Sequence, residues 1–266
     1  EGELGQLVSG ELDVDRMDYL VRDAHHTGAP YGIIDHERLI RELAFVDGAL
    51  VLDEGNVQAA ESLLLARALM HPTVYTLKTA RIGKVLLRRA TDRLIERGGV
   101  AASTVRRMDD YELFVALRGE EATEAFARRL DRRDLYKRAV WAEIDGVPDE
   151  VIDASHAEIR AFERRIADRA GVPERAVLLD VPDRPAMAES TSRVVVNGEV
   201  RRLVDQSRLV EALLEVQTEQ WRLGVYAPAA SVDAVGTAAE SVLGLDVDAL
   251  VSEVRTGRFA TLDEFE

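Results

Sequence analysis

The stretch LDVDRMDYLVRDAHHTG, from Leu12 to Gly28, separates apolar and charged residues onto two faces of a predicted helix. The apolar residues follow the i, i+3, i+4, i+7 spacing of a buried stripe: Met17, Leu20, Val21 and Ala24. Four polar residues share the other face: Asp15, Arg16, Tyr19 and Asp23. Steps of three or four residues keep these side chains within reach of one common ligand.

This combination of polar groups suits a metal ion and a phosphate. A carboxylate is a hard ligand for a divalent cation, and a guanidinium donates two parallel hydrogen bonds to phosphate oxygens. The alternative interpretation is a surface helix whose charges are simply solvated, with Arg16 paired to Asp13 or Asp18. The pattern alone leaves both interpretations open.

A second polar face lies on a long helical pattern that begins after Asn56, a candidate N-cap, and stops near Gly98. Its polar residues recur at i, i+4, i+8 and i+11: Arg67, His71, Tyr75 and Lys78. A different face supplies the predicted core: Leu63, Ala66, Met70, Val74 and Leu77. Pro72 removes the backbone hydrogen bond to residue 68, which predicts a kink or a break.

The run D-V-D-R-x-D-Y-x-x-R-D-x-x-H at residues 13–26 carries a family resemblance. With Tyr31-Gly32 and Asp35-x-x-Arg38-Leu39-Ile40, it resembles the HD-superfamily phosphohydrolases. It is most similar to the branch that hydrolyses deoxynucleoside triphosphates (dNTPs), which includes the vertebrate SAM-and-HD-domain dNTPase and bacterial dNTP triphosphohydrolases. The similarity returns at residues 67–78, 133–137 (RDLYK) and 177–182 (VLLDVP).

The resemblance implies roles for the first polar face. Asp15 matches the last of four metal ligands, the others being two histidines and an aspartate. Arg16 stands where the family has a basic residue on the phosphates. Tyr19 matches a tyrosine on phosphate and sugar, and Asp23 matches an aspartate that takes the 3′-hydroxyl.

On the second polar face, the resemblance places Arg67 on the triphosphate, and His71 and Tyr75 beside the base and deoxyribose. Taken alone, His71 before Pro72 is more typical of an exposed surface residue. The implied reaction is hydrolysis of a dNTP to deoxynucleoside and triphosphate, with a divalent metal ion (Mg, Mn, Fe or Zn) as cofactor.

The chain departs from the family pattern at the metal site. The family's three other ligands and its catalytic histidine lie upstream of the Asp15 motif, and the chain begins at Glu1 and contains no His-Asp dipeptide. His25 and His26 follow the motif and cannot replace the missing set. We therefore expect a part of a longer protein, with Asp15 as its metal ligand and no catalytic acid or base of its own.

Two other functions fit the same residues. One is an HD hydrolase of another nucleotide, such as a monophosphate or a signalling pyrophosphate, although Arg16 together with Arg67 favours a polyphosphate. The other is a regulatory or oligomerisation module that keeps the helices without the metal chemistry.

Composition limits the possible partners. With 266 residues, 47% hydrophobic residues, no membrane-length apolar run, no cysteine and no apolar leader, the sequence predicts a soluble, cytoplasmic, globular protein. A net charge of −15 argues against general binding to nucleic acid or anionic membranes. Of 34 basic residues only three are lysines, a pattern similar to that of halophile proteins.

The fold predicted is mainly α, a helical HD-type domain over residues 1–137 followed by a smaller α+β lobe over residues 138–266. In the first part we expect helices at 36–43, 106–117 and 121–130, and a small hairpin at 48–55. In the second part we expect strands at 139–144, 177–181 and through Val225, a helix at 209–220, and acidic helical segments to the C-terminus. Ser155 and Glu158 predict a capping box, and Asn197-Gly198 predicts a hairpin turn.

Assembly follows from the resemblance, because these proteins form dimers and tetramers and some are activated by a nucleotide between subunits. Arg38 matches an arginine at that regulatory site, but the positions of its basic partners are not basic here. We therefore expect a homo-oligomer without strong nucleotide activation. The alternative role of Arg38 is a surface pair with Glu42, one helical turn away.

Overall fold

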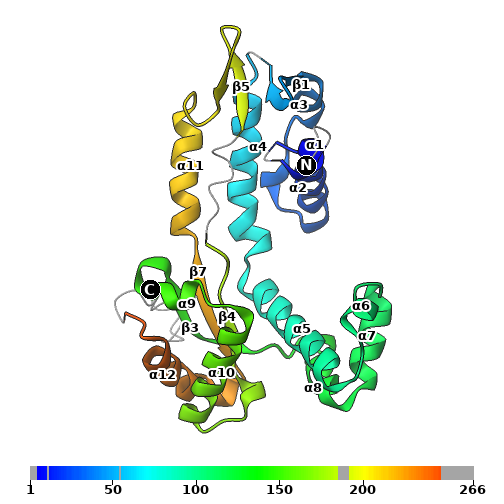
Figure 1. The fold of residues 1–266 in the computed structure, drawn as a ribbon, viewed down its shortest axis with the longest axis vertical. Helices are drawn as coiled ribbons and strands as arrows, with labels where there is room; N and C mark the ends of the chain where they lie inside the picture. Colours follow the sequence, from blue (N-terminus) through cyan, green and yellow to red (C-terminus); the bar gives the residue numbers. More distant parts are fainter. Residues whose placement is uncertain (1–4, 11, 54, 185–191, 247–266) are drawn as a thin grey trace, which may run out of the picture. The chain divides into compact units, whose positions relative to one another are not determined.

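Helices dominate the computed structural model, so the predicted mainly α class is confirmed (Figure 1). The structure describes residues 5–10, 12–53, 55–184 and 192–246. The chain forms two compact units: unit 1 comprises residues 1–77 and 185–221, and unit 2 comprises residues 78–184 and 222–266. These units do not coincide with the division expected at residue 137, because a later segment of the chain returns to pair with the first unit.

Unit 1 is built around α2 (Val14–Thr27) and α4 (Val57–Met70), which pack together. Its other helical segments are α1 (Gln6–Ser9), η2 (Pro30–Gly32), α3 (His36–Glu42), η3 (His71–Tyr75) and α11 (Arg208–Glu219). The core takes buried residues from α2, α3, α4 and α11, among them Leu20, Leu39, Leu63 and Val210. These four predicted helices are therefore held by one shared core.

A four-stranded sheet completes unit 1, with the order β1-β2-β5-β6. Its strands are β1 (Leu43–Val46), β2 (Ala49–Leu52), β5 (Arg193–Val196) and β6 (Glu199–Arg202). The β5–β6 hairpin turns at Asn197-Gly198 as predicted, and both residues adopt positive φ angles. The predicted hairpin at 48–55 was misplaced: the turn is Asp47-Gly48, because the first strand starts directly after α3.

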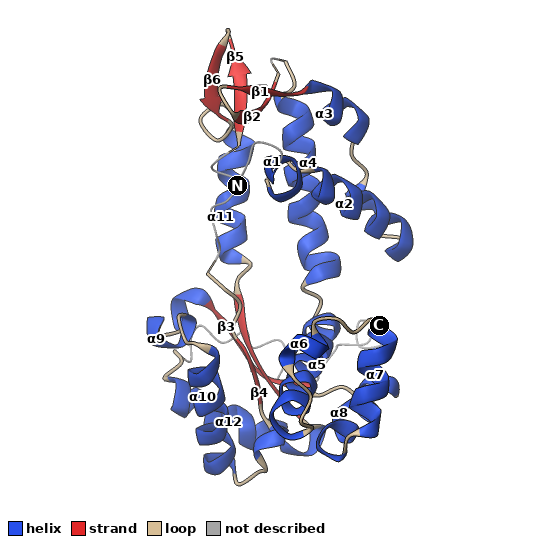
Figure 2. Cartoon of the chain, turned by 45° about the vertical axis from the view of Figure 1, so that its right-hand side comes forward, coloured by secondary structure: helices blue, strands red, loops and turns tan. Residues whose placement is uncertain are grey.

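Unit 2 places helices around a small antiparallel sheet of order β3-β7-β4 (Figure 2). Its strands are β3 (Lys137–Glu143), β4 (Leu178–Asp180) and β7 (Arg222–Ala227), at the three predicted places. Its α-helices are α5 (Lys78–Arg97), α6 (Ala102–Val105), α7 (Asp110–Gly119), α8 (Glu121–Asp131), α9 (Asp149–Ile152), α10 (His156–Ala170) and α12 (Val232–Leu243). Short 3₁₀ turns lie at η4 (Ile144–Gly146), η5 (Glu174–Ala176) and η7 (Ala229–Ser231).

The helix ends of unit 2 show how local sequence sets the elements. Ser155 and Glu158 form the predicted capping box at the start of α10, and Gly171 ends that helix in the left-handed conformation. The acidic helical segments predicted beyond residue 246 lie outside the described residues. Within the part of the chain that the structure describes, no helix is long and apolar enough to cross a membrane.

Candidate functional site

The N-terminus of α2 is fixed by a buried carboxylate. Asp13 occupies the N-cap, and its Oδ1 accepts a hydrogen bond from the backbone N–H of Arg16 at 2.6 Å. Met17, Leu20 and Ala24 are buried and Val21 is half-buried, so the predicted core stripe is confirmed. The polar residues lie on the other face of α2: Asp15 is exposed, and Arg16, Tyr19 and Asp23 are half-buried.

A glycine lets the chain pass close to α2. A Cβ atom on Gly32 of η2 would come within 2.3 Å of the carbonyl oxygen of Leu20, a distance that side chains do not tolerate. Only glycine therefore fits at position 32, and the close packing of η2 against α2 accounts for the glycine of the Tyr31-Gly32 motif.

The second polar face is bent by a π-turn. α4 ends at Met70, residues His71–Tyr75 form the π-helical turn η3, and α5 begins at Lys78, so the predicted break near Pro72 is confirmed. Leu63, Ala66 and Met70 are buried as predicted. Leu77 is 50% exposed, so its assignment to the core was wrong: it follows η3, after the helical periodicity has been interrupted.

Charged side chains meet where α2 begins. The Asp13 pKa is raised by burial of its carboxylate, while the nearby positive charges of Arg16 and Arg67 oppose that rise. The negative charge of Asp15 adds to the rise in the Asp13 pKa. The first turn of α2 and the last turn of α4 therefore bring two guanidinium groups and two carboxylates into one electrostatic neighbourhood.

Aromatic side chains meet two turns further along. The rings of Tyr19 and Tyr75 lie edge to face with centroids 5.7 Å apart, and the His71 ring lies 6.3 Å from Tyr75. Burial raises the pKa of the Tyr75 phenol, and the nearby carboxylate of Asp23 raises it further. The phenol oxygen is buried with no hydrogen-bond partner among the described residues, so its O–H is available as a donor.

We name these residues the α2–α4 cluster: Asp15, Arg16, Tyr19, Asp23, Arg67, His71 and Tyr75. Because Arg67 lies near Asp13 while Tyr75 contacts Tyr19, the two polar faces run side by side in the same direction. One end of the cluster holds Arg16 and Arg67 together with Asp15, and the other is aromatic with one carboxylate. Lys78, the last residue of the predicted second face, belongs to unit 2.

Asp13 is the residue that sequence reasoning undervalued. It was considered only as a surface partner of the Arg16 side chain, whereas it is 5% exposed and bonds the Arg16 backbone. The signal was available, because an aspartate directly before an amphipathic run is a typical N-cap.

Among the described residues, no group of three or more histidine, aspartate or glutamate side chains could hold a metal ion. Asp15 contributes a single exposed carboxylate, and the exposed His25 and His26 pair with each other at the end of α2. The described part of the chain therefore does not fit a complete catalytic metal site.

Arg38 has a structural role that the sequence did not suggest. Its Nε donates to Oδ1 of Asn56 at 2.9 Å, and the Asn56 amide donates to Glu42 at 3.3 Å. Asn56 therefore stands between Arg38 and Glu42, where a direct pair was considered. Although Asn56 is at the N-cap position of α4, its side chain makes no capping hydrogen bond, because it is engaged by this network.

Comparison with known proteins identifies the family. Residues 34–253 match the HD associated region family, so the chain belongs to that family and is related to the HD superfamily. The uncharacterized protein MJ1154 of Methanocaldococcus jannaschii is 32% identical over 232 residues, covering 84% of this chain and 50% of the relative. The uncharacterized protein YwfO of Bacillus subtilis is 38% identical over 81 residues, covering 30% of this chain and 19% of the relative.

Two solved structures share the fold of this chain. A hypothetical protein from Aquifex aeolicus superposes with a TM-score of 0.65 at 22% identity, covering 89% of this chain and 59% of that chain. A phosphohydrolase from Bacteroides thetaiotaomicron gives a TM-score of 0.59 at 21% identity, with coverage of 85% and 63%. This chain thus spans half of MJ1154 and about three fifths of these structures.

Proposed function

We propose that this chain forms the nucleotide-binding part of an HD-type phosphohydrolase that hydrolyses a dNTP to deoxynucleoside and triphosphate. The observation that carries this proposal is the polarity of the α2–α4 cluster, which has two arginines at one end and Tyr19, Tyr75 and Asp23 at the other. The membership in the HD associated region family and the fold shared with the Bacteroides phosphohydrolase support the reaction class.

Each end of the cluster matches one part of such a substrate. A guanidinium group forms paired hydrogen bonds with phosphate oxygens, so Arg16 and Arg67 would offset the charge of a triphosphate. The Tyr19 and Tyr75 rings offer apolar edges to the deoxyribose, and Asp23 accepts a hydrogen bond from its 3′-hydroxyl. A sugar and its phosphates would therefore lie along the direction of the two faces.

The reaction adds water at the α-phosphorus and breaks its bond to the 5′-oxygen, which leaves as the deoxynucleoside hydroxyl. In the HD superfamily a divalent metal ion supplies the activation, and we propose Asp15 as one of its ligands. Because the described residues hold no complete metal site and the relatives are longer, we assign the other ligands to parts of the full-length protein outside this chain.

The test is a product assay on the full-length protein with each dNTP and Mg²⁺ or Mn²⁺. We expect inorganic triphosphate and deoxynucleoside, separated by anion-exchange chromatography. Arg67→Ala should lower kcat/KM by roughly 10- to 100-fold, since a charged hydrogen bond contributes about 1.5 to 3 kcal/mol. The control Arg22→Ala removes an exposed guanidinium of α2 that pairs with Asp18 at 2.8 Å, and it should leave kcat/KM unchanged.

The same assay separates the rival functions. Turnover of monophosphates or of a signalling pyrophosphate with no release of triphosphate would identify a different HD hydrolase. Absence of any turnover by the full-length protein with every nucleotide would favour a regulatory or oligomerisation module.

We also propose that the protein is a homo-oligomer and that dGTP does not change its oligomeric state. The second part follows because Arg38 is already hydrogen-bonded to Asn56 and to the carbonyl oxygen of Gly55. Sedimentation velocity should give the same oligomer with and without dGTP. A shift from dimer to tetramer on adding dGTP would contradict this assignment of Arg38.

A further inference from the structure

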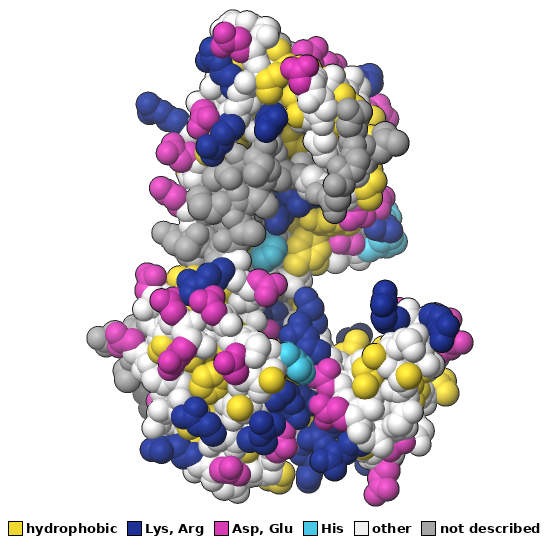
Figure 3. All heavy atoms as spheres, viewed as in Figure 1, with side chains coloured by type: hydrophobic (Ala, Val, Ile, Leu, Met, Phe, Trp, Pro, Cys, Tyr) yellow, Lys and Arg dark blue, Asp and Glu magenta, His cyan; other side chains and the backbone are white. Residues whose placement is uncertain are grey.

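A second charged site lies entirely within unit 2, where α5 and α10 border a pocket of about 540 Å³. Four arginines line this pocket, against two carboxylates, Glu96 and Glu174. The four are Arg93, Arg97, Arg160 and Arg164. In the space-filling view, basic side chains gather in this region of the unit beside a histidine (Figure 3). We call this site the arginine pocket.

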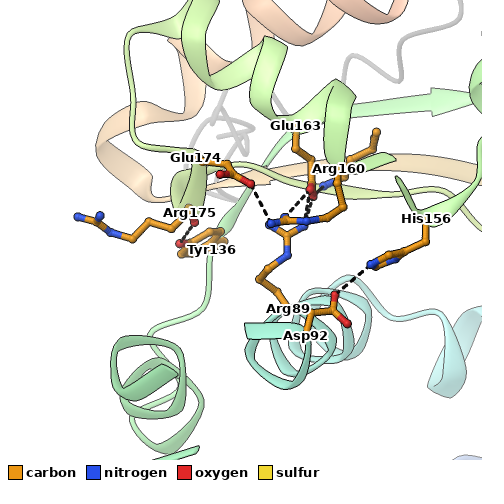
Figure 4. A network of polar contacts seen from close by, with 9 residues as sticks. Arg89, Asp92, Tyr136, His156, Arg160, Glu163, Glu174 and Arg175 are labelled. Atoms are coloured by element: carbon orange, nitrogen blue, oxygen red, sulfur yellow. Dashed lines mark hydrogen bonds and ion pairs between the residues drawn. The ribbon is translucent and has the colours of Figure 1, made fainter. Parts of the chain in front are cut away.

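The base of the arginine pocket is held by a buried ion cluster (Figure 4). Glu163 is fully buried and accepts hydrogen bonds from Arg89, from Arg160 and from the backbone N–H of Leu179. Arg160 is anchored a second time, to Glu174 at 2.8 Å. One lining arginine, Arg160, is therefore held in place by two carboxylates, while Arg97 and Arg164 are exposed at the rim of the pocket.

Three of the pocket's arginines lie outside the buried ion cluster. Arg93, Arg97 and Arg164 form no ion pair with any residue that the structure describes. The Nε of Arg93 is buried without a hydrogen-bond partner in that part of the chain. Desolvation lowers the pKa of Arg93, and although Glu174 opposes this effect, the neighbouring arginines add to it. A buried donor without an acceptor is costly, and an anion in the pocket would supply the acceptor.

His156 adds a further nitrogen to the pocket. It lies at the first turn of α10, and its Nε2 is 3.5 Å from Oδ2 of Asp92. The remaining lining residue is Ala157, so among the described lining residues none is Phe, Tyr or Trp. The guanidinium groups that dominate this lining recognise phosphate oxygens first.

We propose that the arginine pocket is a binding site for an oligophosphate anion, either inorganic or carried by a nucleotide. Three guanidinium groups without an ion pair to any described residue, two from α5 and one from α10, favour a ligand with several negative charges close together, which a di- or triphosphate provides. Its volume is within the usual range of small-ligand sites. Because the whole protein carries a net charge of −15, such a concentration of positive charge opposes the general repulsion of anions.

The test is isothermal titration calorimetry of the 266-residue chain with inorganic triphosphate, and in a second arm with dATP. The variant Arg97→Glu/Arg164→Glu reverses two exposed charges of the pocket, and it should weaken triphosphate binding at least tenfold. The matched control Arg88→Glu/Arg169→Glu reverses two exposed arginines on the same two helices outside the pocket lining, and it should bind within about twofold of wild type.

Binding that also persists in Arg67→Ala would support the pocket and separate it from the α2–α4 cluster, whatever the fate of the proposed reaction. Tighter binding of dATP than of triphosphate would identify a nucleotide as the source of the phosphates, and equal binding would identify the oligophosphate alone. The proposal is overturned if wild type shows no saturable binding, or if the pocket variant and its control lose affinity equally.

Discussion

At the residue scale, Asp13 has two roles: it caps α2, and it lies beside the two arginines of the α2–α4 cluster. Its carboxylate is buried, caps α2 and lies near Arg16 and Arg67. Asp13→Ala removes the hydrogen-bond acceptor and should lower the free energy of unfolding by about 1 to 2 kcal/mol. Asp13→Asn keeps an acceptor oxygen and should lose less, which urea denaturation of both variants at pH 7 will measure.

The raised pKa of Asp13 also predicts a pH dependence. The folded chain takes up a proton at this carboxyl before the unfolded chain does, so wild type gains stability relative to Asp13→Asn as pH falls through the raised pKa. The gain should be complete below the ordinary pKa of 3.8. Urea denaturation of both proteins at several pH values between 7 and 4 measures it. If Asp13→Asn instead became more stable relative to wild type as the pH falls, the raised pKa of Asp13 would be contradicted.

Tyr75 is the residue on which sugar selection depends in this account. Its ring packs against Tyr19, where a 2′-hydroxyl of a ribonucleotide would be crowded. Tyr75→Ala should therefore lower the ratio of dNTP to rNTP turnover by the full-length protein, by about tenfold. Tyr75→Phe keeps the ring and should retain most of the selection. An unchanged ratio in Tyr75→Ala would show that this face does not contact the sugar.

At the element scale, local signals were sufficient at several caps and turns, although the hairpin turn at Asp47-Gly48 and the engagement of Asn56 away from its cap were missed. The capping box of Ser155, the Asn197-Gly198 turn and the break at Pro72 were all predictable because each acts within a few residues. The parallel pairing of β2 with β5 was not predictable, because it joins Val51 to Arg193 across most of the chain. That pairing is also why the two units differ from the sequence division.

The α2–α4 cluster illustrates the same limit. Helical periodicity alone established which residues share each polar face, but it could not show that the two faces meet. The contact of Tyr19 with Tyr75 joins α2 to the turn that follows α4, so it depends on the packing of α2 against α4, which is a tertiary feature.

The ion cluster between α5 and α10 predicts the strongest effect of a single conservative change in unit 2. Glu163→Gln leaves Arg89 and Arg160 without their buried counter-charge, so the free energy of unfolding should fall by about 3 to 5 kcal/mol. Glu150→Gln, an exposed change on α9, should lie within about 0.5 kcal/mol of wild type. Equal unfolding midpoints for the two variants would mean that the cluster contributes no net stability.

At the scale of the whole molecule, the acidic composition predicts a strong response to salt. We propose that the chain is adapted to high ionic strength, since 49 acidic residues face 34 basic ones. Adding KCl shortens the screening length to about 3 Å at 1 M and reduces self-repulsion. Tm measured by circular dichroism should therefore rise between 0.1 M and 2 M KCl. A Tm that stays constant or falls would contradict this proposal.

The central claim is that the α2–α4 cluster binds a dNTP with its phosphates at the Arg16 and Arg67 end and its sugar at the Tyr19 and Tyr75 end. The most direct measurement is the inhibition constant of each product half against dNTP hydrolysis by the full-length protein. We predict that Arg67→Ala weakens inhibition by triphosphate and leaves inhibition by deoxynucleoside unchanged, whereas Tyr75→Ala does the reverse. This orientation would be contradicted if each variant weakened inhibition by triphosphate and by deoxynucleoside equally, or if neither inhibition constant changed.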